Sequence, residues 1–296
     1  GELRNMFHGS VVALATPFRD DFEIDWDAYG RLIEFQIEQG THGILPCGCT
    51  GEAATLSHDE QKKIIKFAVE RVEGRRPVIA GTGSNNTREA VELTAYAKSV
   101  GADAALLITP YYNKPTPAGL MAHYRAISDK VDIPIMLYNV PSRTGTKIEP
   151  ETICKLQQIP NVVSVKEACG SVDQVSQILS LCDINVMSGD DSLTLPMMAV
   201  GATGVVSVAA NVAPDRVAEM CDKFLAGDLE TARAIHYELM PLFKALFVET
   251  NPMPVKAILA EMGMIKNVLR LPLTPMLPEK LASIRPVIRE LMAVSA

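Results

Sequence analysis

The sequence lacks any apolar run long enough to cross a bilayer, and it lacks any cluster of basic residues. A membrane-spanning helix needs about 20 consecutive apolar residues, so a membrane protein is not expected. The 28 Lys and Arg residues are outnumbered by 35 Asp and Glu residues, for a formal net charge of −7. An acidic chain without a basic patch is a poor partner for nucleic acid or an anionic membrane.

The N-terminus also lacks the basic and apolar segments of a secretory signal, and we expect a cytoplasmic protein. Residues 1–5 precede Met6, which can serve as the initiator. We interpret residues 1–5 as a remnant of an expression vector and leave them out of the fold argument.

Cysteine is too sparse for a disulfide framework: six residues occur in 296, and we expect reduced thiols. Cys47 and Cys49 have no matching Cys or His pair nearby, and the five histidines show no ligand spacing. The segment 81–83 lacks the third glycine of a dinucleotide-binding motif, and Gly189-Asp190-Asp191 is a weak metal candidate. The sequence therefore predicts no metal and no redox cofactor.

Short apolar, β-branched runs alternate with longer helical patterns along residues 11–226. This alternation is typical of βαβ units and a parallel sheet. The predicted strands are 11–15, 43–47, 77–80, 104–108, 134–138, 162–165, 185–188 and 204–208. Eight such units favour a closed barrel over an open doubly wound sheet, which usually has fewer strands in this length.

The pattern changes after Gly227. Segments 228–247, 254–261 and 279–293 are predicted helices with no strand between them, and prolines punctuate the linkers. The predicted fold is thus α/β, a (β/α)8 TIM barrel over residues 6–227 with a C-terminal α-helical appendage over residues 228–296.

Polar residues at the C-terminal ends of the strands are the candidates for chemistry, because barrel enzymes place their active sites there. Lys166 follows a short strand that should be buried, and burial lowers the pKa of an ammonium group. A neutral amine can attack a ketone and form a Schiff base. The alternative is a structural ion pair between Lys166 and Glu167 or another carboxylate.

Three further features sit at neighbouring strand ends. Tyr138 should lie at the same height as Lys166 and could transfer protons, or it could be a buried tyrosine with a simple partner. Arg143 could hold a carboxylate by two parallel hydrogen bonds, or it could be a solvated loop arginine. The turn 48–52 offers backbone N–H groups and the Thr50 hydroxyl to a carboxylate, or it could be only a tight turn.

Seven motifs then indicate a known family. They are GCTGEAATL (48–56), GTGSN (81–85), TPYYNKP (109–115), YNVPSRTG (138–145), KEACG (166–170), SGDD (188–191) and NPMPVK (251–256). In this order the chain resembles the dihydrodipicolinate synthase family, within the wider family of N-acetylneuraminate lyase and pyruvate-dependent class I aldolases. The resemblance covers essentially the whole chain from Met6.

The resemblance implies a lyase reaction in lysine and diaminopimelate biosynthesis. Pyruvate forms an imine with Lys166, and the derived enamine attacks the aldehyde of L-aspartate 4-semialdehyde. Cyclisation releases 4-hydroxy-tetrahydrodipicolinate. The same resemblance implies Tyr138 as proton donor and acceptor, Thr50 and the backbone at Val206 as pyruvate-binding positions, and Arg143 as the group that holds the semialdehyde carboxylate.

Other site residues follow from the same resemblance. Gly189 is expected in the substrate site, and Tyr112 is expected to reach a neighbouring subunit's site in a homotetramer built as a dimer of dimers. Cys49 stands where the family has a threonine that links two tyrosines in a proton relay. A thiol is a weak hydrogen-bonding group, so we expect Cys49 to slow the relay unless water replaces the link.

Some family members bind lysine between subunits as an inhibitor. The positions that match this site are Ala54, His58, Asn85, Glu89 and Tyr111. Gln61 stands where lysine-sensitive relatives have a second histidine, so we expect weak or absent inhibition.

Two alternatives remain open from the sequence. An N-acetylneuraminate or 2-keto-3-deoxy sugar acid lyase shares the fold and the imine chemistry, but such relatives usually lack the arginine of SRTG and the YYNKP pairing. A non-catalytic binding protein with a degraded site has Cys49 as its only support.

Overall fold

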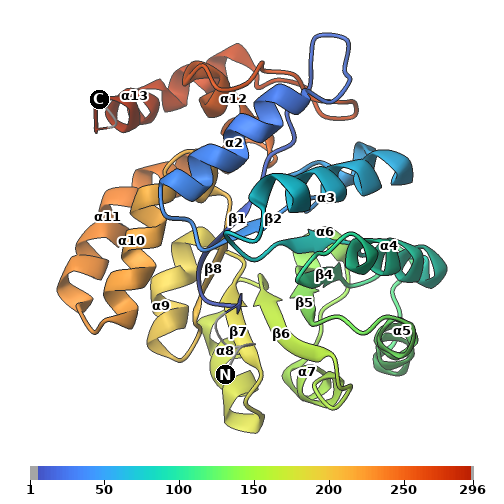
Figure 1. Ribbon diagram of the computed structural model, residues 1–296. Coiled ribbons are helices and arrows are strands. Elements are labelled where there is room, and N and C mark those ends of the chain that lie inside the picture. The colour runs from blue at the N-terminus through green and yellow to red at the C-terminus, as the bar shows by residue number, and fades with distance from the viewer. Residues whose placement is uncertain (1–5, 295–296) are drawn as a thin grey trace.

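The computed structural model describes residues 6–294 and has a parallel barrel at its centre (Figure 1). Its strands are β1 (Gly9–Ala13), β2 (Gly43–Leu45), β3 (Ile79–Gly81), β4 (Ala104–Ile108), β5 (Ile135–Asn139), β6 (Val162–Glu167), β7 (Asn185–Ser188) and β8 (Gly204–Ser207). They pair in the order β2-β1-β8-β7-β6-β5-β4-β3. A parallel bridge between Ile44 and Val78 joins the two ends of this order, so the ring is nearly closed. The predicted TIM barrel is confirmed.

Helices follow the strands and cover the outside of the ring. They are α2 (Trp26–Glu38), α3 (His58–Val72), α4 (Thr87–Ser99), α5 (Pro117–Lys130), α7 (Pro150–Leu156), α8 (Val172–Leu181), α9 (Thr194–Ala199) and α10 (Pro214–Leu225). Local sequence sets several of their starts. Ser57 and Glu60, for example, form a reciprocal capping box that satisfies orphan N–H groups at the start of α3.

The strands are mostly apolar because each has two buried faces. One set of side chains fills the barrel interior, with Leu106, Met136, Met187 and Val206 among its members. The alternate set packs between the strands and the surrounding helices. A polar side chain that ends a strand and points inward therefore enters a dry environment.

Three further helices form the predicted C-terminal appendage: α11 (Leu229–Ala245), α12 (Met253–Glu261) and α13 (Pro278–Val294). α11 packs along α10, and α13 contacts both α11 and α12. The red helices α12 and α13 lie together at the top of Figure 1, near α2. Within residues 6–294, no helix combines the length and apolarity that a membrane crossing requires.

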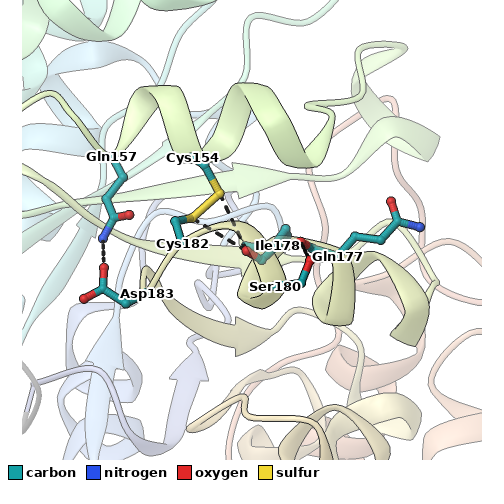
Figure 2. The surroundings of a disulfide bond; sticks show 7 residues. All are labelled: Cys154, Gln157, Gln177, Ile178, Ser180, Cys182 and Asp183. Atoms are coloured by element: carbon teal, nitrogen blue, oxygen red, sulfur yellow. Dashed lines mark hydrogen bonds between the residues drawn. A yellow bond between two sulfur atoms is a disulfide. The ribbon is translucent and has the colours of Figure 1, made fainter.

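One expectation about cysteine is wrong. Cys154 on α7 and Cys182 after α8 form a disulfide (Figure 2), whereas the sequence analysis expected reduced thiols throughout. Nearby, Gln157 donates a hydrogen bond to Asp183 at 2.8 Å across the same pair of segments. The composition argument addressed disulfide frameworks and could not detect a single pair, because adjacency of α7 and α8 arises only when the barrel forms.

Residues 1–5, interpreted above as a vector remnant, lie outside the described residues.

Candidate functional site

Lys166 lies near the end of β6, inside the barrel mouth. The parallel register pairs Lys166 with Tyr138 of β5 and with Met187 of β7. The expectation that Lys166 and Tyr138 share one height is therefore confirmed. The Lys166 ammonium nitrogen, Nζ, lies 3.9 Å from the centre of the Tyr138 ring, and both residues are buried.

The surroundings of Lys166 favour its neutral amine. Burial, the largest cause, lowers the pKa of Lys166 to about 8 against the opposing influence of Cys49 and Asp191. The neighbouring Arg143 guanidinium lowers it further. About a tenth of the amine is therefore unprotonated at pH 7, far more than for an ordinary lysine, and the neutral amine is the form that attacks a carbonyl.

The alternative of a Lys166–Glu167 ion pair is wrong. Successive strand residues point to opposite faces, so Glu167 lies on the outer side of β6. Its carboxylate accepts hydrogen bonds from Asn139 Nδ2 at 3.1 Å and from the Cys169 N–H at 3.2 Å. Within residues 6–294, Lys166 forms no ion pair with any carboxylate.

Tyr138 is held in its protonated form. Burial raises the pKa of Tyr138 well above its usual value, and the neighbouring Cys49 thiol raises it further. The phenol is therefore a proton donor at neutral pH. Cys49 lies beside Tyr138.

The strand-two turn is shaped by two residues in the left-handed region, Cys47 with φ 60° and Glu52 with φ 57°. Thr50 lies buried in this turn, and its Oγ1 accepts a hydrogen bond from Asn251 Nδ2 at 3.0 Å. Glu52 forms a fully buried ion pair with Lys256 on α12, with an N–O distance of 2.6 Å. The C-terminal appendage thus reaches back to hold the turn.

Arg143 comes from α6 (Pro141–Thr144), a short helix that the sequence analysis did not predict. Its Nη2 donates to the backbone oxygen of Asn251 at 3.1 Å. Among the described residues Arg143 pairs with no carboxylate, so its remaining N–H groups can bind a carboxylate ligand. Arg143, Tyr138 and Cys49 all line one cavity of about 450 Å³.

Gly189 lies against the Lys166 side chain, and Val206 lies inside the same barrel. A Cβ atom on Gly189 would lie 3.0 Å from Lys166 Cγ and 3.1 Å from Cε, so a side chain at this position would displace the amine. Val206 on β8 belongs to the apolar cluster inside the barrel that also contains Tyr138. Of the two predicted positions, Gly189 therefore adjoins Lys166, while Val206 shares the barrel interior with Tyr138.

Asp191, part of the weak metal candidate, is occupied by hydrogen bonds within the fold. Its carboxylate accepts hydrogen bonds from Ser207 Oγ and from the N–H groups of Val208 and Ala209 at the end of β8. No three His, Cys, Asp or Glu side chains gather as possible metal ligands within residues 6–294.

The remaining predicted residues divide into two groups. Four of the five candidate lysine-site residues line the same cavity: Ala54, His58, Glu89 and Tyr111. Asn85 does not line it, but Asn85 Nδ2 donates to the Tyr111 backbone oxygen at 3.0 Å. Tyr112 points away and is 89% exposed, so within one chain it is not part of the Lys166 site.

Three residues of this site were missed by the sequence analysis, namely Asn251, Glu52 and Lys256. Their role depends on the C-terminal segment folding over the barrel mouth, which no rule about strand ends predicts. The motif NPMPVK, which contains Asn251 and Lys256, was the available signal.

Comparison with known proteins gives consistent matches. A model of the dihydrodipicolinate synthetase family matches residues 6–291. The chain is 54% identical over 285 residues to a 4-hydroxy-tetrahydrodipicolinate synthase of Nitratidesulfovibrio vulgaris strain Miyazaki F, covering 95% of this chain and 97% of that protein.

Solved structures agree in fold. Dihydrodipicolinate synthase from Aquifex aeolicus has a TM-score of 0.94 and 52% identity, covering 96% of this chain and 98% of that one. A lysine-bound synthase structure from Cyanidioschyzon merolae has a TM-score of 0.94 and 39% identity, covering 97% of this chain and 99% of that one.

Proposed function

The chain belongs to the dihydrodipicolinate synthetase family, and we propose that its Lys166 amine joins pyruvate to L-aspartate 4-semialdehyde. The activity is that of a 4-hydroxy-tetrahydrodipicolinate synthase, a lyase of lysine and diaminopimelate biosynthesis. The observation that carries the assignment of Lys166 is its burial beside Tyr138, with its pKa lowered to about 8.

The reaction begins when the neutral Lys166 amine attacks the pyruvate ketone and water leaves, giving an imine. Loss of a methyl proton converts the imine to an enamine, whose carbon attacks the semialdehyde aldehyde. Tyr138 supplies and recovers protons in these steps, and Cys49 lies beside its hydroxyl. Attack of the second substrate's amino group on the imine carbon then closes the ring and releases Lys166.

The two substrate carboxylates need separate partners. Thr50, with the backbone near Val206, is the proposed partner of the pyruvate carboxylate. Arg143 is the proposed partner of the semialdehyde carboxylate, and its free N–H groups suit bidentate binding. Gly189 leaves the space that the Lys166 chain and its imine occupy.

A condensation assay tests this function. Pyruvate and L-aspartate 4-semialdehyde are mixed with the protein, and product is followed through a coupled reductase. Lys166→Ala should abolish turnover, whereas Lys155→Ala, which removes an exposed lysine on α7, should leave it unchanged. Turnover that survives Lys166→Ala would contradict the proposed role.

The same assay addresses the alternatives raised by the sequence. A sugar-acid lyase would prefer N-acetylmannosamine or a glyceraldehyde as the aldehyde acceptor. A non-catalytic binding protein would turn over none of them. The retained Lys166, Tyr138 and Arg143, together with relatives that are synthases, support the semialdehyde.

We also propose a lysine-binding site at Ala54, His58, Asn85, Glu89 and Tyr111, with weak or absent inhibition. His58 Nε2 lies 3.6 Å from Glu89 Oε2. Gln61, in place of a second histidine, is buried and donates to the Gly81 backbone oxygen at 2.9 Å. Gln61→His should strengthen inhibition by lysine, and full inhibition of the unsubstituted enzyme at low lysine concentration would contradict the proposal.

We propose in addition a cytoplasmic homotetramer, built as a dimer of dimers, in which Tyr112 enters a neighbouring subunit's site. The 89% exposure of this aromatic side chain supports the idea, because it leaves the ring accessible to a second subunit. The proposed domain division is a catalytic barrel over residues 6–227 and a helical domain over residues 228–296.

A further inference from the structure

Asn251 touches two side chains that the proposed function assigns to different substrates. It lies in the segment between α11 and α12 and is 5% exposed. Its Nδ2 donates to Thr50 Oγ1 at 3.0 Å, and its backbone oxygen accepts from Arg143 Nη2 at 3.1 Å. One residue of the C-terminal segment therefore contacts the proposed partners of both substrate carboxylates.

We propose that Asn251 is a positioning residue that fixes the Thr50 hydroxyl and the Arg143 guanidinium relative to each other. The inference rests on the proposed function, which names these two groups as carboxylate partners. Carbon–carbon bond formation needs reacting atoms about 3–3.5 Å apart, so the spacing of the two bound carboxylates determines how often that geometry occurs.

The direction of the Asn251–Thr50 hydrogen bond matters. A threonine hydroxyl has one proton to donate and two lone pairs that accept. Because Asn251 donates to Oγ1, the Thr50 proton remains available for the pyruvate carboxylate. A donor on the oxygen also strengthens the hydrogen bond that the hydroxyl gives.

The Arg143 contact leaves the carboxylate-binding groups free in the same way. Nη2 uses one N–H on the Asn251 oxygen, and a guanidinium has five. The contact restricts the orientation of the guanidinium plane. An oriented guanidinium loses less conformational entropy when it binds a carboxylate.

A buried ion pair holds both segments in place. Lys256, on the helix that follows Asn251, donates from Nζ to Glu52 Oε2 at 2.6 Å and to the Thr16 backbone oxygen at 2.8 Å. Glu52 belongs to the same turn as Thr50. The Asn251–Thr50 hydrogen bond is therefore made between two segments that are already fixed to each other.

The test uses Asn251→Ala and Asn251→Asp in the condensation assay, with KM measured separately for each substrate. Asn251→Ala removes the donor to Thr50 but keeps the backbone oxygen. The pyruvate KM should rise about tenfold, and the semialdehyde KM should rise less. Asn251→Asp keeps the shape but accepts the Thr50 proton, so its pyruvate KM should rise at least as much.

A double-mutant cycle with Thr50→Val separates this role from a purely structural one. Once the hydroxyl is gone, Asn251→Ala should cause no further rise in the pyruvate KM. The control is Asn161→Ala, which removes a different bridging asparagine whose Nδ2 donates to Ser128 Oγ at 3.0 Å. It should lower the melting temperature without a selective change in either KM.

Three outcomes would overturn the inference: equal rises in both KM values for Asn251→Ala, full additivity with Thr50→Val, or a fall in melting temperature with unchanged KM values. Borohydride trapping of pyruvate on the unsubstituted protein distinguishes failure of the proposed function from failure of the role of Asn251. No trapped adduct would remove the proposed function and this role together. A trapped adduct whose pyruvate dependence is unchanged in Asn251→Ala would remove only the role of Asn251.

Discussion

Burial of Lys166 at the end of β6 disfavours its charged form and thereby prepares it as a nucleophile. The pKa falls from 10.5 to about 8, mainly through desolvation. Tyr138 is shifted in the opposite direction, so the phenol keeps its proton while the amine loses one. The buried Lys166 amine and Tyr138 hydroxyl therefore suit opposite roles, with the amine as nucleophile and the phenol as proton donor.

The pH dependence of kcat/KM for pyruvate follows from this lysine. Below about pH 8 most Lys166 is protonated, so kcat/KM should rise about tenfold per pH unit and flatten above pH 8. The raised pKa of Tyr138 predicts no fall until strongly alkaline pH. Initial rates between pH 6 and 10 test this, and a flat profile across that range would contradict it.

A substitution at Cys49 tests its proposed part in proton transfer. Its thiol lies beside Tyr138, and a thiol forms weaker hydrogen bonds than a threonine hydroxyl. Cys49→Thr should raise kcat several-fold and change the pyruvate KM little, because the relay and not the binding site is altered. Cys169→Thr, which places the same substitution outside the Cys49–Tyr138 contact, is the control. An unchanged or lower kcat for Cys49→Thr would indicate that the thiol or a water already completes the relay.

Lys166, Tyr138, Thr50 and Arg143 were predictable as candidates because each lies at or shortly after the C-terminal end of a strand in an eight-unit pattern. Asn251 was not, although it contacts two of them. Its position depends on tertiary packing of the appendage over the barrel mouth. Such contacts have no local periodicity, and only the resemblance of NPMPVK to the family marked the segment.

At the scale of elements, β6 is enclosed by a covalent loop. Cys154 on α7 and Cys182 after α8 form the disulfide of Figure 2 and are 28 residues apart in the sequence. β6, with Lys166, lies between them in the chain. A disulfide restricts the unfolded chain more than the folded one. This bond therefore favours the state in which the strand and its flanking helices are assembled.

Loss of the disulfide should lower the free energy of unfolding by about 3–4 kcal/mol, as the loop length predicts in the chain-entropy model. Urea unfolding with and without a dithiol reductant measures this change. The Cys154→Ser variant is the control, because reductant should not shift its midpoint. Thiol titration of the unreduced, unfolded protein should find four free cysteines, and six would contradict the disulfide.

Most element positions agreed with the sequence patterns, but the four-residue helix α6 was missed. A helix of about one turn is too short for an apolar period to appear. The missed helix matters for function because α6 carries Arg143, the proposed partner of the semialdehyde carboxylate.

At the scale of the whole molecule, the appendage has a part in the site. Three hydrogen bonds join the C-terminal segment to the strand-two turn and the helix after it. They run from Lys256 to Glu52, from Asn251 to Thr50 and from Arg270 to Glu60. The pKa of Glu60 is lowered to about 2, chiefly by its hydrogen bond with Arg270. A boundary at residue 227 therefore divides the chain by architecture, while the catalytic unit spans both parts.

The proposed assembly makes a complementation test possible. Lys166→Ala and Tyr112→Phe should each be nearly inactive alone. The two variants are unfolded and refolded together to form hybrids. If Tyr112 enters a neighbouring subunit's site, some sites in these hybrids combine an intact Lys166 from one subunit with an intact Tyr112 from the other. Such mixtures should regain measurable turnover, and sedimentation should show oligomers. Absence of any recovery in confirmed hybrids would contradict the shared site.

The most direct measurement is borohydride reduction of the protein with pyruvate, followed by peptide mapping. The account predicts one pyruvate-derived adduct, on Lys166, whose yield rises as pH approaches 8. Lys166→Ala should give no adduct, while Lys155→Ala should behave as the unsubstituted protein. An adduct on another lysine, or none at pyruvate concentrations that sustain turnover, would contradict imine formation at Lys166.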